Sequence, residues 1–547
     1  MESKDPEVAI ATDGPISRAP TDVQGEISHS GVAEPALART LESRHLIFFS
    51  LGSSIGLGLW LGSGATLATG GPVSNVLGFL TAGVISWSVA QATGEIACNY
   101  PIPSAFPRWA DKFIDRAPAF TLAWSYWLLL TLTLAAEIQG AVTVVRYWTD
   151  ALHVSVWVTI FLAILLLINV FEVKLFGEVE FFFSVIKFFW IFVVIIMFIV
   201  ISAGGAPNHT TTGFRYWREI PFINGFKGFL TGLYNCIFSM AGTEFLGLTA
   251  AEARDPKRSV PKAVNTVWIR LGLFYVGGAF FTTLCVDPRD PDLFGASGTN
   301  ASPFNIAMLR AGLPNAAHVM NGIILISVLS CGNAGAYASS RIPVGLAHIG
   351  MAPKIFLKTD ARGRPWPSIM LTFVVGGGIS YLNASASASQ VFVWLARLVG
   401  LGELFNWAMI FLTHIRFRQA WAAQGYTKAD LPWATKFYPY SSGIGLGMCL
   451  LLIVNQFYLS VWPLGESPSA DNFFGGFISI VVLLFVYICA KIYWRGPLYR
   501  KRGQIDLVRD RRIYPPEDSE TKDGRTGFPL VKALWMSLRK RPGDSNR

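Results

Sequence analysis

The stretch SLGSSIGLGLWLGSG, residues 50–64, is apolar enough to lie in a lipid bilayer, yet a third of it is glycine. Glycine inside a helix costs about 1 kcal/mol relative to alanine, so this concentration requires a reason. One explanation is a small-residue face for close helix packing, because several of these glycines are four residues apart. The other is a helix that unwinds inside the membrane, where freed peptide groups can bind a ligand.

Two enzymatic readings of the same stretch are disfavoured. Its glycine spacing is GxGxxxG instead of the dinucleotide-binding GxGxxG, and no acidic residue that could bind a ribose occurs between Glu42 and Glu95. The match GSSIG at residues 52–56 has the letters of a nucleophile elbow, but it lies in an apolar run instead of a strand-to-helix turn. We therefore expect no catalytic residue and no enzyme activity.

A second interrupted stretch favours the unwound helix. Residues 235–247 read NCIFSMAGTEFLG, in which a small-residue cluster precedes the carboxylate of Glu244 inside an apolar run. Paired interruptions at corresponding places of two halves are typical of transporters built from inverted repeats. If the first ten spans form a 5+5 inverted repeat, these two stretches lie in spans 1 and 6, the first helix of each half.

The composition predicts an all-α polytopic membrane protein. Of 547 residues, 52% are hydrophobic and 15% are charged, whereas soluble domains carry about 25% charged residues. A helix that crosses a bilayer needs about 20 mostly apolar residues, which gives about twelve expected spans. These are 46–67, 74–98, 119–145, 154–173, 181–203, 229–251, 267–286, 319–345, 367–386, 389–414, 443–463 and 473–494.

Lys and Arg gather on alternate connections, so the positive-inside rule places both termini in the cytoplasm. We expect a disordered cytoplasmic tail over 1–44, a transmembrane domain over 45–494 and a basic cytoplasmic tail over 495–547. Two glycosylation sequons, at Asn208 and Asn300, then fall outside. The net charge of +10 fits these topology signals, so we expect a lipid bilayer and no nucleic acid as partner.

The six cysteines show no metal-ligand spacing, and we expect reduced, buried thiols and no metal.

An α-amino acid suits the paired breaks. The N–H groups around Gly56, Leu57 and Gly58 would form a half-helix N-terminus, which favours a carboxylate. Carbonyl groups near Phe238 and Ala241 could accept hydrogen bonds from an ammonium group, and the Phe238 ring could close over the ligand.

The chain resembles fungal amino-acid permeases, the yeast amino acid transporter family of the amino acid–polyamine–organocation superfamily. The motifs that carry the resemblance are SSIGLGLWLGSG, TGGP at 69–72, GEIACNYP at 94–101, FSMAGTE, EARDPKRSVPKAV at 252–264, LSCGNAGAYASSR at 329–341, GRP at 363–365 and HIRFRQAWAAQGY at 414–426. The resemblance implies an inverted repeat over ten spans with broken helices 1 and 6, and two further C-terminal helices. It also implies proton symport at the plasma membrane, with the proton as coupling ion and no cofactor.

By this resemblance the amino-acid site lies on the two breaks, although many relatives have Thr where this chain has Leu57. The residues assigned to substrate binding are Ser54, Ile55, Gly56, Leu57, Gly58, Phe238, Ser239, Ala241, Gly242 and Thr243. Candidates for side-chain selectivity lie on neighbouring spans and are Ala136, Ser330, Asn333, Glu403 and Phe405. Glu403 departs from the small residues that many relatives carry there.

Ionisable groups inside the membrane are functional candidates, and three are assigned to proton coupling. Lys187 in span 5 would stand near the break of span 1, where relatives are thought to use a lysine in place of a sodium ion; snorkelling to the interface is the alternative. Glu244 would exchange a proton or hold the unwound segment by hydrogen bonds. Glu137 in span 3 could face a buried cation or the substrate amine.

The sequence therefore predicts a secondary transporter that imports amino acids by alternating access. A weakly transporting or non-transporting amino-acid sensor (a transceptor) is the alternative. Pro256 and Pro261 are expected to break any helix over 252–264 and to leave an inner-gate loop there. The sequence leaves open the substrate and the oligomeric state.

Overall fold

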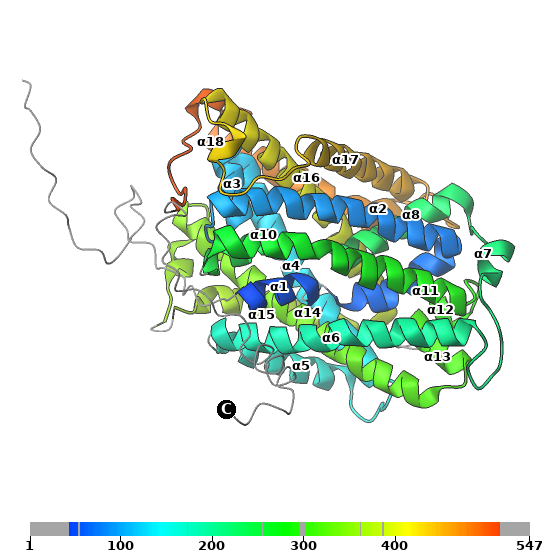
Figure 1. Ribbon diagram of the computed structural model, residues 1–547. Helices are drawn as coiled ribbons and strands as arrows, with labels where there is room; N and C mark the ends of the chain where they lie inside the picture. Colours follow the sequence, from blue (N-terminus) through cyan, green and yellow to red (C-terminus); the bar gives the residue numbers. More distant parts are fainter. Residues whose placement is uncertain are drawn as a thin grey trace, which may run out of the picture. The chain divides into compact units, whose positions relative to one another are not determined.

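Long apolar helices make up almost all of the structure (Figure 1). The computed structural model describes residues 43–52, 55–171, 173–253, 255–295, 302–360, 363–384 and 388–514. Within these residues, the β-structure is one isolated bridge between Ala203 and Thr211. The predicted all-α fold is confirmed, and the expected tail over 1–44 and residues 515–547 lie outside the described residues except for the start of α1.

In the part of the chain that the structure describes, eight helices are long and apolar enough to cross a bilayer, and two shorter apolar helices, α5 (Val154–Val170) and α15 (Trp366–Ser380), accompany them. The long helices include α2 (Ser63–Asn99), α4 (Arg116–Val145), α6 (Val173–Ser202), α14 (Pro314–His348), α16 (Ala388–Ala423), α17 (Tyr440–Val461) and α18 (Ala470–Trp494). The continuous segment over 58–99 contains the second part of span 1 and the whole of span 2. Span 6 is divided into two shorter helices and is therefore not among the eight. The observed path therefore follows the twelve predicted spans.

The two spans within 58–99 meet at Gly71, where the backbone takes φ 86° and ψ 177°. An L-residue rarely adopts this conformation. A Cβ at Gly71 would also lie 3.0 Å from the backbone of the segment 221–223. The following Pro72 starts the second span, so the TGGP motif is the junction between spans 1 and 2.

The seventh span corrects one expectation. The motif over 252–264 is mostly helical, because α10 (Pro256–Ile269) begins inside it and continues through η3 (Arg270–Gly277) into α11 (Gly278–Cys285). Pro256 occupies the first turn, where its missing N–H costs nothing, and the Asp255 side chain caps the helix by accepting from the N–H of Arg258 at 3.3 Å. Pro261 lies within α10. The prediction that these prolines prevent a helix is therefore wrong.

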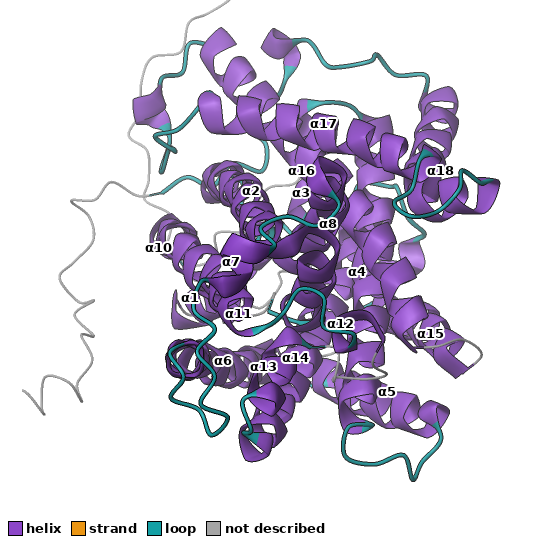
Figure 2. Cartoon of the chain, turned by 90° about the vertical axis from the view of Figure 1, so that its right-hand side faces the viewer, coloured by secondary structure: helices purple, strands orange, loops and turns teal. Residues whose placement is uncertain are grey.

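The helices are arranged around α4, α8 (Gly225–Met240) and α14, which lie near the middle of the view in Figure 2. The helix α4 packs along α14 and α16, while α8 packs along α2. The short helix α1 (Ser43–Gly52) lies between α6 and α10 (Figure 1). By contrast, α17 and α18 expose most of their apolar surface, with Val454 69% and Phe485 67% exposed. Such an apolar face suits lipid.

Residues 495–514 are the first part of the expected C-terminal tail. They fold back onto the end of the bundle that carries α3 (Ala105–Phe113), which we call the α3 end. The N–H of Arg512 donates to the carbonyl of Asn99 at 2.9 Å, and the Tyr100 hydroxyl donates to the carbonyl of Leu507 at 2.7 Å. The basic tail therefore begins as a docked segment.

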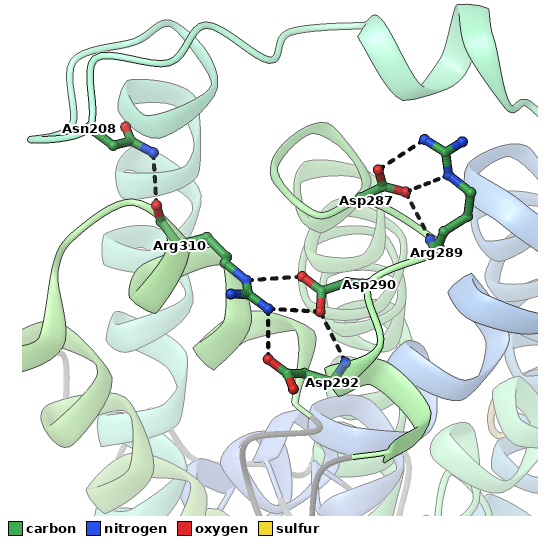
Figure 3. A network of polar contacts seen from close by, with 6 residues as sticks. All are labelled: Asn208, Asp287, Arg289, Asp290, Asp292 and Arg310. Carbon is green, nitrogen blue, oxygen red and sulfur yellow. Dashed lines mark hydrogen bonds and ion pairs between the residues drawn. The ribbon is translucent and has the colours of Figure 1, made fainter.

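The opposite end of the bundle carries α7 (Arg215–Glu219). Ion pairs and hydrogen bonds connect the loops at this end (Figure 3). Arg310 pairs with Asp290 at 3.1 Å and with Asp292 at 2.8 Å. The Asn208 side-chain amide donates to the carbonyl of Arg310 at 2.8 Å. The nitrogen that a glycan would occupy in this sequon is thus already hydrogen-bonded. Asn300 lies outside the described residues.

Candidate functional site

The first span is interrupted at the glycine-rich stretch. The helix α1 ends at Gly52, and the π-helix η1 (Gly58–Gly62) begins six residues later, with Leu57 as its N-cap. Ile55 and Gly56, between them, are not helical. Ser54, a predicted substrate contact, lies outside the described residues. Regular helical winding is therefore lost at the place where the sequence predicts an unwound segment.

The sixth span is interrupted at the matching place. The helix α8 ends at Met240 and α9 (Phe245–Thr249) begins after four residues. Gly242 has φ 92°, which an L-residue would adopt only with strain. The two breaks also touch, because a Cβ added at Gly58 would lie 2.6 Å from the Cα of Ser239.

A narrow cavity lies between the two breaks, and its space for water-sized molecules is ≈ 20 Å³. Its walls come from both interrupted spans and from α4 and α14. The lining residues are Gly56, Gly58, Leu129, Leu130, Thr133, Glu137, Phe238, Ser239, Ala241, Gly242, Glu244, Phe245 and Cys331. Six of the ten predicted substrate residues are among them, and Ile55 and Leu57 adjoin Gly56 in the chain.

Glu137 of α4 binds the break of span 1 directly. Both of its carboxylate oxygens accept from the N–H of Leu57, at 3.2 and 3.1 Å. Its side chain is almost fully buried and also faces Cys331. The peptide group predicted to bind the substrate carboxylate therefore already holds a carboxylate of the chain itself.

Lys187 of α6 binds the other side of the same break. Its ammonium group donates to the carbonyl of Gly52 at 2.6 Å and to the hydroxyl of Ser330 at 2.8 Å, with the carbonyl of Ile55 at 3.4 Å. The side chain is 1% exposed, which excludes snorkelling. A cation at the C-terminal end of a helix, here α1, is favoured by the exposed carbonyls and the helix dipole.

Glu180 is a site residue that the sequence analysis missed. It accepts at 2.6 Å from the same Ser330 hydroxyl that accepts from Lys187, and its negative charge faces that ammonium group. Glu180 and Lys187 are seven residues apart on one helix, hence on the same face. That spacing was the available signal, but the predicted span began at residue 181 and excluded Glu180.

Glu244 holds the break of span 6 together. It accepts from the Tyr126 hydroxyl at 2.9 Å, from the N–H of Gly242 at 3.0 Å and from the Trp407 indole at 3.2 Å. Glu403 lies beside it, fully buried, and within the described residues neither Glu403 oxygen makes a hydrogen bond of good geometry. Two adjacent buried carboxyl groups repel each other when both are ionised.

Arg270 is the second residue that the sequence analysis missed. It is fully buried, donates to the carbonyl of Ser50 at 2.9 Å and also hydrogen-bonds the hydroxyl of Thr243. Thr243 bonds Ser86 on its other side at 2.6 Å, so its hydroxyl faces α2 and η3 and not the cavity. Arg270 thus joins the end of α1 to the break of span 6, and the signal was an arginine inside a predicted span.

None of the five selectivity candidates belongs to the cavity lining. Ser330 binds Lys187 and Glu180, and Asn333 accepts from the side chain of Asn169 at 2.8 Å. Ala136 packs in a small cluster with Ala135 and Leu395, Phe405 packs against the main core, and Glu403 faces Glu244. The structure therefore brings together the backbone site but not these five positions.

A buried ion pair lies at the α3 end of the bundle. Glu252 ends the short helix η2 (Ala250–Glu252), and Arg341 of α14 binds it at 2.9 Å. The Tyr337 hydroxyl donates to the same carboxylate, the Arg341 guanidinium lies 3.3 Å from the centre of the Tyr337 ring, and Phe176 stacks on that ring at 4.0 Å. Spans 5, 6 and 8 are thus tied together at this end.

We expect Arg341→Gln to loosen the contacts among Glu252, Tyr337 and α14 and to open the α3 end. Losing one partner of a buried ion pair costs about 3–5 kcal/mol, so access to the cavity from the α3 end should rise at least about tenfold. The rate at which a maleimide labels Cys331, read by mass spectrometry on purified protein, measures it. The control is Arg258→Gln, which alters a pair at the surface with Asp255. Equal labelling in both variants would show that the pair closes nothing.

Comparisons with known proteins show the family of the chain. The family model described as "Amino acid permease" matches residues 45–502. The chain is 38% identical to "Amino-acid permease GAP5" of Candida albicans, covering 90% of this chain and 80% of that protein. It is 36% identical to "Cationic amino acid transporter 1" of Schizosaccharomyces pombe, covering 91% of this chain and 85% of the relative.

A third relative extends over nearly the whole chain. "Amino acid transporter 1" of Schizosaccharomyces pombe is 34% identical and covers 97% of this chain and 96% of its own length. The match of the family model spans both helix breaks, the cavity between them and all the apolar helices. The chain is a multi-pass membrane protein that belongs to the amino acid permease family.

Proposed function

We propose that the protein is a secondary active transporter that imports amino acids across the plasma membrane together with protons. The observation that carries the proposal is the pair of helix breaks, which meet at one cavity with peptide groups of opposite polarity. Unwound backbone inside a membrane is tolerated where it lines such a cavity. The α3 end, on which residues 495–514 dock, carries Arg108, Lys112 and Arg116. By the positive-inside rule this proposal places that end, and with it both termini, in the cytoplasm.

The substrate lies between the two breaks. Its carboxylate binds N–H groups at the start of η1, around Leu57 and Gly58, where the helix dipole favours negative charge. Its ammonium group binds carbonyl groups at the end of α8, near Phe238 and Ser239, where the dipole favours positive charge. Phe238, which lines the cavity, covers the ligand when the carrier closes.

Alternating access uses the closures at the two ends in turn. The Glu252–Arg341 pair keeps the cytoplasmic end shut while the substrate enters from outside. Lys187 and Arg270 join the end of α1 to spans 5, 6 and 7, so a movement of that helix changes their contacts. Closing over the substrate, followed by rupture of the Glu252–Arg341 pair, then opens the inner path.

A proton gradient supplies enough free energy for accumulation. One proton moving down about 1 pH unit contributes about 1.4 kcal/mol, and a membrane potential of about 100 mV adds about 2.3 kcal/mol. Together they support roughly 500-fold accumulation of a neutral amino acid per proton. The buried groups available to exchange that proton are Glu137, Lys187 and the Glu244–Glu403 pair.

Uptake of labelled amino acids by cells that lack their own permeases tests the proposal. We expect saturable uptake that a protonophore abolishes, because the gradient drives accumulation. Purified protein in liposomes should likewise accumulate substrate only when the outside is made acidic or the inside is made electrically negative. Binding without any accumulation would contradict the transporter and support the sensor instead, while accumulation that ignores the protonophore would contradict proton coupling.

Competition by a panel of all common amino acids identifies the substrate. One relative is named a cationic amino acid transporter, and Glu403 is the selectivity candidate that could recognise a cationic side chain. If it does, lysine and arginine compete best, and Glu403→Gln weakens their competition selectively. If Glu403 acts only through Glu244, the variant changes the rates of all substrates alike.

A further inference from the structure

The strongest unexplained feature of the site is the carboxylate on Leu57. The break of span 1 creates an N–H donor at the start of a half-helix, and Glu137 occupies it with both oxygens at 3.2 and 3.1 Å. A substrate carboxylate has the same charge, shape and acceptor geometry. In the proposed function it needs the same donor.

The cavity has no room for both carboxylates at this point. A methyl group added at Gly56 would collide with the Glu137 carboxylate and come within 2.8 Å of the Cys331 side chain. Glu137 therefore fills the space in front of Gly56, and both residues belong to the cavity wall. A substrate carboxylate can reach the Leu57 N–H only after the Glu137 side chain has moved away.

We propose that Glu137 is an internal competitor, which holds the substrate's carboxylate position in the empty carrier and is displaced when an amino acid binds. The proposal rests on the proposed function, because it needs a zwitterionic substrate at the two breaks. Glu137 then controls substrate binding through the peptide group of Leu57, although it lies in the middle of the regular helix α4. Substrate binding is then an exchange of one carboxylate for another on the same peptide group.

Displacement also explains how a proton can enter with the substrate. The titratable and charged groups that face Glu137 are Lys187 from α6, Cys331 from α14 and Tyr275 from η3. Lys187 is already bound to Gly52 and Ser330. Among the described residues of this wall, no cation is left free to pair with a displaced Glu137 carboxylate, and taking up one proton neutralises it. The zwitterion is neutral, so the loaded carrier carries one more positive charge than the empty one.

The sign of the pH dependence follows. Raising the pH keeps Glu137 ionised and strengthens the competitor, so the apparent affinity for the amino acid falls. For one proton taken up per substrate, the fall approaches about tenfold per pH unit. Lowering the pH neutralises Glu137 and weakens its hydrogen bond to the Leu57 N–H, so a substrate carboxylate displaces it more easily. A purely structural glutamate would instead help binding most when it is ionised.

Glu137→Gln tests the proposal on the purified full-length protein. The amide oxygen of glutamine can still accept from Leu57, so the break keeps its support, but the negative charge is gone. Using the amino acid that competes best in the panel, we expect the variant to bind at least about tenfold tighter than the wild type at alkaline pH. Its affinity should be nearly independent of pH between about 5 and 8, and it should exchange substrate but not accumulate it.

Two further variants make the result decisive. Glu137→Asp keeps the charge but is shorter, so it should bind substrate more tightly than the wild type and retain the pH dependence, even if the glutamine variant does not fold. Glu219→Gln, on exposed α7, should behave as the wild type. The proposal would be overturned if either variant bound the substrate more weakly than the wild type. It would also be overturned if Glu137→Gln kept the pH dependence of the wild type. If the wild type itself neither binds nor exchanges any amino acid, the proposed function is wrong and this inference falls with it.

Discussion

Gly58→Ala is expected to abolish amino-acid uptake, with a loss of about a hundredfold or more, because the new methyl group enters the contact between the two breaks. The added Cβ would lie 2.6 Å from the Cα of Ser239, a backbone atom that cannot turn aside as a side chain would. The break of span 1 must then move away from the break of span 6. The peptide groups that bind the two ends of the substrate lose their spacing.

Gly62→Ala is the matched control one turn later on the same helix. Its Cβ would meet its nearest atom, the Ser239 hydroxyl oxygen, at 3.5 Å, an ordinary contact. We expect its uptake to stay within about twofold of the wild type, since alanine is also the better helix former. Initial rates are measured with each variant's amount at the cell surface determined in parallel. Equal uptake by the two variants would show that the contact at Gly58 plays no part in transport.

Lys187→Met is expected to reduce uptake by about a hundredfold or more, since it leaves the buried Glu180 carboxylate unpaired at a cost of about 3–5 kcal/mol. It also removes the donor that joins Gly52 and Ser330. The end of α1 then has no cation on its carbonyls. We expect both a lower thermal stability of the purified protein and a loss of transport.

The double variant Lys187→Met, Glu180→Gln separates these two effects. Removing the unpaired charge should restore much of the stability but none of the uptake, because the link between span 5 and the break of span 1 is still missing. Lys262→Met, at an exposed position of α10, is the control and should change neither quantity. Uptake restored by the double variant would mean that Lys187 serves folding alone.

The helix breaks could be predicted because glycine and small residues are local signals. Their cost in a regular helix is intrinsic to the residue, so the clusters at 52–64 and 241–243 indicated irregular backbone without any knowledge of neighbours. The spans could be predicted for a similar reason, since the bilayer thickness sets the length of every apolar run.

The partners within the site could not be predicted, because they depend on how distant helices face one another. Nothing local places Glu137 on the N–H of Leu57, eighty residues earlier in the chain. Arg270 was overlooked because an arginine near the start of a span can also reach the interface. The α10 helix shows the opposite error, since proline breaks a helix interior but suits its first turn. The docking of residues 495–514 likewise depends on contacts across the whole bundle.

An experimental structure of the carrier with its best-competing amino acid bound would show whether the two breaks bind the ligand. We expect ligand density between the two breaks, with the carboxylate within hydrogen-bonding distance of the N–H groups of Leu57 or Gly58. The ammonium group should lie against carbonyl groups at the end of α8, with Glu137 turned away from Leu57. Helices wound continuously through Gly56 and Gly242, or a ligand bound elsewhere while Glu137 still holds Leu57, would contradict it.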